Sequence, residues 1–92
     1  MSNEILKERG SVYGDFRTNL LARANIMNNL DKVHLGKTTE KLDSVHYQAI
    51  NDIVIKLVRL AASPEHIDSW RDLSLYAQLN VTRLGGDMNS ED

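Results

Sequence analysis

Two aspartates one helical turn apart are the residues of this sequence best placed to do chemistry. Asp68 and Asp72 lie at i and i+4, and in a helix this spacing puts both carboxylates on one face, within reach of a shared cation. Hard cations such as Mg²⁺ take several oxygen ligands, so two carboxylates alone make a weak metal site. Lys56 and Arg59 lie shortly before them. We favour an ion pair between Asp68 and one of these bases over a metal ligand.

The same segment holds the single tryptophan, Trp70, with Arg71 next to it. The spacing of Trp70 from Leu73 and Ala77 is helical and favours a position in the core, while a surface anchor for a partner is the alternative. Tyr13 precedes Gly14 and Asp15, where it packs at a turn or stacks on a base or a partner side chain. The candidate binding residues are therefore Tyr13, Asp15, Lys56, Arg59, Trp70, Arg71 and Tyr76.

Several other kinds of chemistry lack the residues they need. The sequence has no cysteine, which excludes disulfides, thiolate catalysis and the common structural zinc sites. Its three histidines have neither metal-ligand spacing nor a nucleophile to activate. The tripeptide from Gly36 to Thr38 is similar to the end of a phosphate-binding loop, but Asp31 stands where that motif needs its first glycine. Nucleophilic catalysis and a phosphate-binding loop are both unsupported.

Length and composition predict one small domain. The chain has 92 residues, of which 41% are hydrophobic and 26% charged, and a chain of this size has only a modest core of its own. The formal net charge of −2 provides no basic field for extended nucleic acid. Neither a signal peptide nor an apolar run of about 20 residues is present, so we expect a cytoplasmic protein with no membrane contact.

Hydrophobic periodicity predicts four helices. Asn3 caps a short helix over Glu4 to Arg9, and Asp15 caps a second that runs from Phe16 to about Val33. The inward face of this second helix is expected to carry Phe16, Leu20, Ala24, Met27 and Leu30, and its polar face to carry Arg17, Asn19, Arg23, Asn25 and Asn29. The glycine and the two threonines between His34 and Lys41 indicate a loop.

The third and fourth helices meet at the single proline. Asp43 is expected to cap the third helix, which runs to Ala62 and carries a broad apolar stripe that contacts more than one neighbour. Ser63 is expected to cap the fourth helix, which begins at Pro64 or Ile67 and ends at Arg83. The predicted fold is all-α, a small antiparallel helical bundle with a short N-terminal helix and three longer ones. It comprises residues 1–86, is completed by oligomerisation, and is followed by a flexible acidic tail, 87–92.

Several short motifs spread over most of the chain resemble a widespread family of short, uncharacterised bacteriophage proteins. The motifs are Glu8-Arg9-Gly10, Tyr13-Gly14-Asp15-Phe16, Lys56-x-x-Arg59-Leu60 and Asp68-Ser69-Trp70-x-Asp72-Leu73. The resemblance implies an all-α protein. It also implies a distant similarity of the fourth helix to MazG-type nucleoside triphosphate pyrophosphohydrolases, which hold Mg²⁺ with carboxylates from facing helices.

The sequence departs from that enzymatic pattern on the third helix. Where the MazG-type site has a Glu-x-x-Glu pair, this chain has Asn51, Asp52, Ile55 and Lys56. A positive side chain among the metal ligands repels Mg²⁺. Catalysis is therefore disfavoured by the same residues that suggest the resemblance.

Two functions follow as expectations. In the first, the chain is a small phage accessory protein that acts by binding a host or phage protein and inhibits a host protein or defence system. It is expected to form a homo-oligomer, in the simplest case a dimer. In the second, it binds or hydrolyses a nucleotide. Asp68 and Asp72, with Asp52, then hold Mg²⁺, and Lys56, Arg59 and Tyr13 contact phosphates or base.

Overall fold

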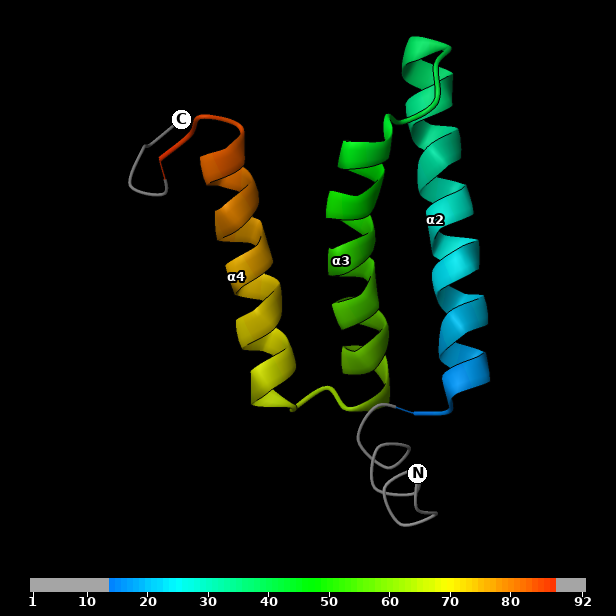
Figure 1. The fold of residues 1–92 in the computed structure, drawn as a ribbon. Coiled ribbons are helices and arrows are strands. Elements are labelled where there is room, and N and C mark those ends of the chain that lie inside the picture. Colours follow the sequence, from blue (N-terminus) through cyan, green and yellow to red (C-terminus); the bar gives the residue numbers. More distant parts are fainter. Residues whose placement is uncertain (1–13, 88–92) are drawn as a thin grey trace.

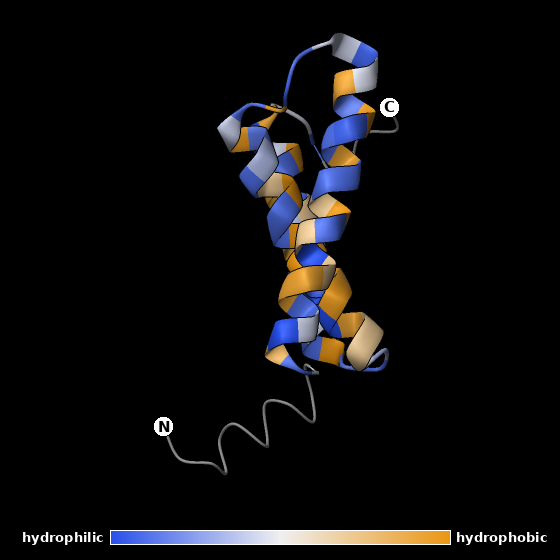
Figure 2. Cartoon of the chain, turned by 90° about the vertical axis from the view of Figure 1, so that its right-hand side faces the viewer, coloured by the Kyte–Doolittle hydropathy of each residue, from blue (hydrophilic) through white to orange (hydrophobic). Residues whose placement is uncertain are grey.

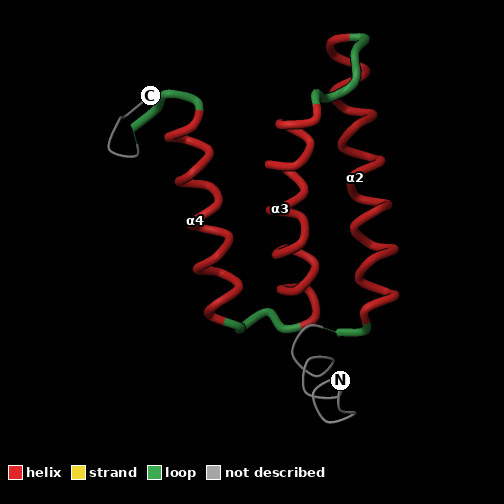
Figure 3. Tube along the Cα trace, viewed as in Figure 1, coloured by secondary structure: helices red, strands yellow, loops and turns green. Residues whose placement is uncertain are grey.

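Residues 14–87 are described by the computed structural model, and they form three helices laid side by side (Figure 1). The helices are α2 (Phe16–Thr38), α3 (Ser44–Ala62) and α4 (Ile67–Arg83). Successive helices run in opposite directions, and α3 lies in the middle with α2 and α4 on its two sides. The all-α prediction is confirmed for this part of the chain, which contains helices and loops but no strand (Figure 3). The short helix expected over Glu4 to Arg9 lies outside the described residues.

Aspartate caps fix where α2 and α3 begin, as the sequence predicts. The Thr18 backbone N–H donates to Asp15 Oδ2 over 2.9 Å, and the Thr18 hydroxyl donates to the same oxygen over 3.0 Å. At α3, the His46 backbone N–H donates to Asp43 Oδ1 over 2.9 Å. Each carboxylate satisfies a backbone donor that has no partner inside its helix. Asp15, a candidate binding residue, therefore has a structural role.

The predicted end of α2 was wrong, because the helix continues five residues beyond Val33 to Thr38. A single helical glycine such as Gly36 costs only about 1 kcal/mol, which the rest of a long helix can tolerate. The helix ends at Thr38. The next residue, Thr39, adopts a left-handed conformation with φ of 63° and donates its N–H to Leu35 O over 2.9 Å. The connection between α2 and α3 therefore comprises only residues 39–43, and the first part of the loop predicted between His34 and Lys41 is helical.

The corner between α3 and α4 also differs from the prediction. Ser63 is the C-cap of α3, where its N–H donates to Arg59 O over 2.9 Å. The N-cap position of α4 belongs to His66 instead. A turn follows, in which the His66 N–H donates to Ser63 O over 3.0 Å. α4 begins at Ile67, the later of the two expected positions, and ends at Arg83 as predicted.

A small apolar cluster holds α2 against α3. Met27, Val54 and Val58 are its buried members, and Ala22, Ile26, Leu30, Tyr47 and Ile50 pack around them. The predicted inward face of α2 is only partly right, because Met27 is 2% exposed but Phe16 is 77% exposed. The spacing of its apolar residues spreads them around most of the circumference of α2, and apolar and polar residues are mixed on the side of the layer that Figure 2 turns to the viewer. Periodicity alone therefore chose a neighbouring face. Asn19 and Arg23, expected in solvent, are half-buried.

The three-helix layer leaves much apolar surface in solvent. α2 and α4 lie on opposite sides of α3, so neither can cover the other (Figure 1). Large hydrophobic side chains with 44% to 77% of their surface exposed occur on all three helices. In a small domain, such surface indicates a place where something else packs. Over residues 14–87, no helix combines the length and the apolar character that crossing a membrane requires.

Candidate functional site

A buried lysine joins α3 to α4. Lys56 is 8% exposed, and its Nζ donates to Asp72 Oδ2 over 2.8 Å. The hydrogen bond from Lys56, followed by its positive charge, lowers the pKa of Asp72 below the usual value of 3.8. A buried ammonium is tolerable only when it is paired in this way. The i+4 aspartate is therefore part of the helix–helix contact.

The other aspartate of the pair has a different partner. Arg71 Nη1 donates to Asp68 Oδ1 over 3.3 Å, and both side chains are three-quarters exposed. The expected pairing of Asp68 with a base on α3 was thus wrong in its partner: Asp72 binds Lys56, and Arg59 adds a smaller lowering to the Asp72 pKa. The carboxylate that pairs with α3 is thus the one that lies one helical turn later in α4 than predicted.

The metal-binding alternative needs several oxygen ligands in one place. Within the described range, no three histidine or carboxylate side chains lie close enough together to hold a metal ion. Asp52 therefore does not join Asp68 and Asp72 in such a group. The ammonium of Lys56 sits on Asp72 instead, where it occupies the position that a cation needs.

Ser69 and His66 form a second polar contact at the corner. His66 Nδ1 and Ser69 Oγ share a hydrogen bond of 2.8 Å. This geometry resembles a nucleophile with its base, but Ser69 is 2% exposed and no substrate reaches its hydroxyl. The contact stabilises the first turn of α4, which lacks a side-chain cap of its own. We assign it a structural role.

Trp70 lies on the surface, so its predicted core position was wrong. It is 51% exposed, and its indole N–H donates to Pro64 O over 2.8 Å. The core position one residue earlier belongs to Ser69, and a step of one residue turns the side chain by about 100° around the helix. The hydrogen bond to Pro64 holds the ring at the corner while about half of the side chain stays in solvent.

Trp70 is part of a shallow groove on the side of α4 that faces away from α3. The groove has a volume of about 360 Å³ and is lined by Ile67, Trp70, Arg71, Ser74, Leu75 and Gln78. Sequence reasoning found two of these residues, Trp70 and Arg71. It missed Leu75, although Leu75 and Leu79 recur at a helical spacing outside the α3-facing series. This second apolar stripe was the feature of the sequence that could have indicated an exposed apolar surface on α4.

The remaining candidates do not join this groove. Tyr76 is half-buried and belongs to the α3-facing series of α4. Asp15 lies at the start of α2, and Tyr13 lies outside the described residues. The structure thus brings Trp70 and Arg71 together on the outer side of α4 and uses Lys56 inside the fold.

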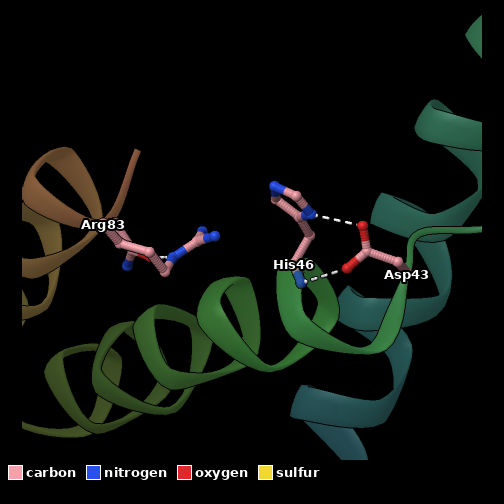
Figure 4. A network of polar contacts seen from close by, with 4 residues as sticks. Asp43, His46 and Arg83 are labelled. Atoms are coloured by element: carbon pink, nitrogen blue, oxygen red, sulfur yellow. Dashed lines mark hydrogen bonds and ion pairs between the residues drawn. The ribbon is translucent and has the colours of Figure 1, made fainter. Parts of the chain in front are cut away.

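The opposite end of the layer carries a second charged cluster. His46 Nδ1 lies 2.7 Å from Asp43 Oδ2 at the start of α3, and the Arg83 Nε donates to Asn80 Oδ1 over 3.0 Å near the end of α4 (Figure 4). The backbone N–H of His46, followed by its side chain, lowers the pKa of Asp43 below 3.8. The Asp43 contacts cap α3, and the Arg83 contact joins two residues near the end of α4.

Comparisons with known proteins supply no further identification. No protein-family model, curated protein or solved structure matches the chain. Function must therefore be argued from the outer side of α4, where exposed apolar side chains and one arginine share a surface.

Proposed function

We propose that the protein functions by binding another protein through the outer side of α4. The observation that carries this proposal is the exposure of Leu75 and Leu79, which are 51% and 55% exposed one helical turn apart. Isolated exposed leucines are common on protein surfaces, but two neighbours beside an apolar groove form a patch. Patches of this kind are typical of sites where a partner packs.

The patch suits insertion of a helix into a partner's groove. Arg71, Leu75 and Leu79 are spaced at i, i+4 and i+8, so they share one face of α4. In helix-in-groove recognition, residues at these spacings anchor in apolar pockets while a charged residue at the edge fixes the orientation. Arg71 is suited to that edge position because its planar guanidinium bonds carboxylates in a fixed geometry.

The chemistry of the corner favours binding over hydrolysis. Lys56 holds the carboxylate of Asp72, and the other aspartate bonds Arg71. The resemblance to bacteriophage proteins supports a host protein as the partner, bound so that its activity is inhibited. The nucleotide-hydrolase alternative has no observation in its favour beyond the resemblance itself.

Affinity capture from a bacterial lysate tests the proposal. The wild-type chain should retain a discrete host protein, and Leu75→Asp should lose it, because a carboxylate at this position cannot enter an apolar pocket. Leu35→Asp is the matched control, since Leu35 is 45% exposed on α2, far from the patch. The captured protein, identified by mass spectrometry and purified, should then bind the wild-type and Leu35→Asp chains in calorimetry. Equal retention by all three chains, or by none, would contradict the proposal.

A further inference from the structure

The groove on the outer side of α4 runs along the helix axis. Its lining residues recur at spacings of three, one, three, one and three, so the groove extends over roughly 16 Å of the helix. A row of this kind accepts the side-chain ridge of a second helix. An extended peptide would instead need the free backbone groups of a sheet edge, and residues 14–87 contain no strand. The groove therefore fits a helix that lies along α4.

Arg71 carries the one charge among the described residues that line this groove. Three of the others are apolar. The remaining two, Ser74 and Gln78, are neutral, and Gln78 Nε2 donates to Ser74 Oγ over 3.3 Å. A helix that covers the groove removes water from the guanidinium, and a covered cation is stable only beside a negative group. An acidic helix is therefore the kind of partner that suits the groove.

The carboxylate that Arg71 bonds in the separate chain belongs to a residue outside the groove lining. Arg71 Nη1 donates to Asp68 Oδ1 over 3.3 Å, and each of these side chains is 75% exposed. Ion pairs exposed to this degree contribute little to stability. A carboxylate inside a covered groove interacts more strongly with the guanidinium, because the surrounding dielectric constant is lower. The contact with Asp68 is therefore one that a partner's carboxylate can replace.

We propose that the partner packs an acidic helix into this groove, and that an Asp or Glu of this helix replaces Asp68 on Arg71. This inference rests on the proposed binding through the outer side of α4, and it names the chemistry of the partner. An apolar side chain of the same helix enters the groove beside Trp70, whose indole N–H is already bonded to Pro64 O over 2.8 Å. That bond positions the apolar wall before the partner arrives, which lowers the entropy lost on binding.

Asp68 and Arg71 then have opposite effects on binding, although they lie one helical turn apart. Arg71 attracts the partner's carboxylate. Asp68 competes for the same guanidinium and repels the incoming charge. A surface that bound its partner through apolar contacts alone would respond to neither residue. The opposite signs of the two effects are therefore specific to an exchanged ion pair.

Two synthetic peptides test this chemistry without the partner itself. Both form an amphipathic helix with the same leucines; one has Glu at the flanking positions and the other has Lys, and neither contains tryptophan. Trp70 is the only tryptophan of the chain and is 51% exposed in the groove, so its fluorescence reports occupancy. Titration of the full chain should give a Kd for the Glu peptide about tenfold or more below that for the Lys peptide.

Substitutions on α4 locate the effect. Arg71→Gln should reduce the difference between the two peptides to less than about threefold, and Asp68→Asn should lower the Kd of the Glu peptide by about threefold or more. Arg83→Gln is the matched control, because it removes the same charge from an exposed position outside the groove, where Arg83 bonds the neutral Asn80. Its Kd values should stay within about twofold of the wild type. Circular dichroism checks that all three variants fold, which the exposure of residues 68, 71 and 83 predicts.

Each of four results would overturn the acidic helix. The first is no change in the fluorescence of Trp70 with either peptide, and the second is equal Kd values for the two peptides. The third is an equal effect of Arg71→Gln and Arg83→Gln. The fourth is a Glu peptide that binds no more tightly to the Asp68→Asn chain than to the wild type.

These outcomes separate the acidic helix from the proposed function on which it rests. A host protein retained by the wild type and lost by Leu75→Asp, together with equal Kd values for the two peptides, would overturn the acidic helix alone. Selectivity for the Glu peptide that depends on Arg71, with no host protein retained, would contradict the proposed function alone.

Discussion

On the side of α3 that faces α2, the contact is apolar: Met27 packs between Val54 and Val58. On the side that faces α4, the buried groups include Lys56, paired with Asp72, and Ser69, bonded to His66. One helix therefore makes two contacts of different chemistry. The apolar contact stabilises in proportion to the area it buries and is indifferent to direction. The polar contact requires specific atoms to meet and fixes how α4 lies against α3.

The difference has a functional consequence. A directional contact holds α4 in one rotation about its axis, so its outer residues face solvent in a defined order. With Asp72 bonded to Lys56, Ser69 is buried and Trp70, Leu75 and Leu79 are exposed. Variants that weaken each contact separately show how much stability each provides.

The largest effect is expected at the apolar contact. Met27→Ala should lower the free energy of unfolding by about 2–5 kcal/mol, because Met27 is 2% exposed and its removal leaves a cavity. Urea denaturation measures the change. Leu21→Ala on the same helix is the control, since Leu21 is 56% exposed and surface substitutions usually change stability by less than about 0.5 kcal/mol. Equal losses in the two variants would show that α2 does not pack through Met27.

At the polar contact, removing the acid should be worse than removing the base. Asp72→Ala leaves the ammonium of Lys56 buried without its partner, whereas Lys56→Met keeps the aliphatic stem and leaves a carboxylate that is already half exposed. Urea midpoints should therefore fall further for Asp72→Ala. The double variant Lys56→Met/Asp72→Ala should be more stable than Asp72→Ala alone. If the urea midpoint fell further for Lys56→Met than for Asp72→Ala, the ammonium of Lys56 would be hydrated in the folded chain.

The two contacts should also respond differently to acid. Lys56 lowers the pKa of Asp72 below its usual 3.8, so the folded state binds fewer protons than the unfolded state in this range. The resulting stability is fully present above pH 3.8 and is lost as the pH falls through the lower, folded pKa. Asp15 and Asp43 titrate in the same direction, because backbone N–H groups lower the pKa of each.

Asp72→Asn therefore tests the acid response of the polar contact. Denaturation between pH 7 and pH 2 should show a flatter fall for Asp72→Asn than for the wild type, while Met27→Ala should lower the curve without changing its shape. A wild-type slope in the Asp72→Asn variant would assign the acid sensitivity to the two caps instead.

The sequence predicted the parts of the fold that depend on neighbouring residues. Asp15 and Asp43 were recognised as caps because a cap needs only a carboxylate and a backbone N–H three residues on. The α3 boundaries and the end of α4 followed from the same local rules. Of the candidate binding residues, Trp70 and Arg71 line the outer groove, and their role in binding stays a prediction.

The errors arose where two helices must choose a rotation relative to each other. Ser69, Trp70 and Asp72 offer alternative faces with similar periodicity, and only the pairing with Lys56 decides between them. A buried serine beside an exposed tryptophan contradicts average burial preferences, so no pattern based on hydrophobicity would place them correctly. The face of α2 was ambiguous for the same reason, because apolar residues occur around most of its circumference.

The smallest effect is expected at the end of α2, beyond the packed cluster. Gly36 is exposed in a helix, and a Cβ added there meets nothing within 4 Å, so Gly36→Ala should raise the free energy of unfolding by about 0.5–1 kcal/mol. Gly14 provides the contrast. Its φ is +81°, and an added Cβ would lie 3.1 Å from the Ala62 Cβ, so Gly14→Ala should destabilise the chain. Urea denaturation of both variants measures the two signs. If Gly36→Ala also destabilised the chain, the end of α2 would be packed in solution and Gly36 would not be exposed as it is here.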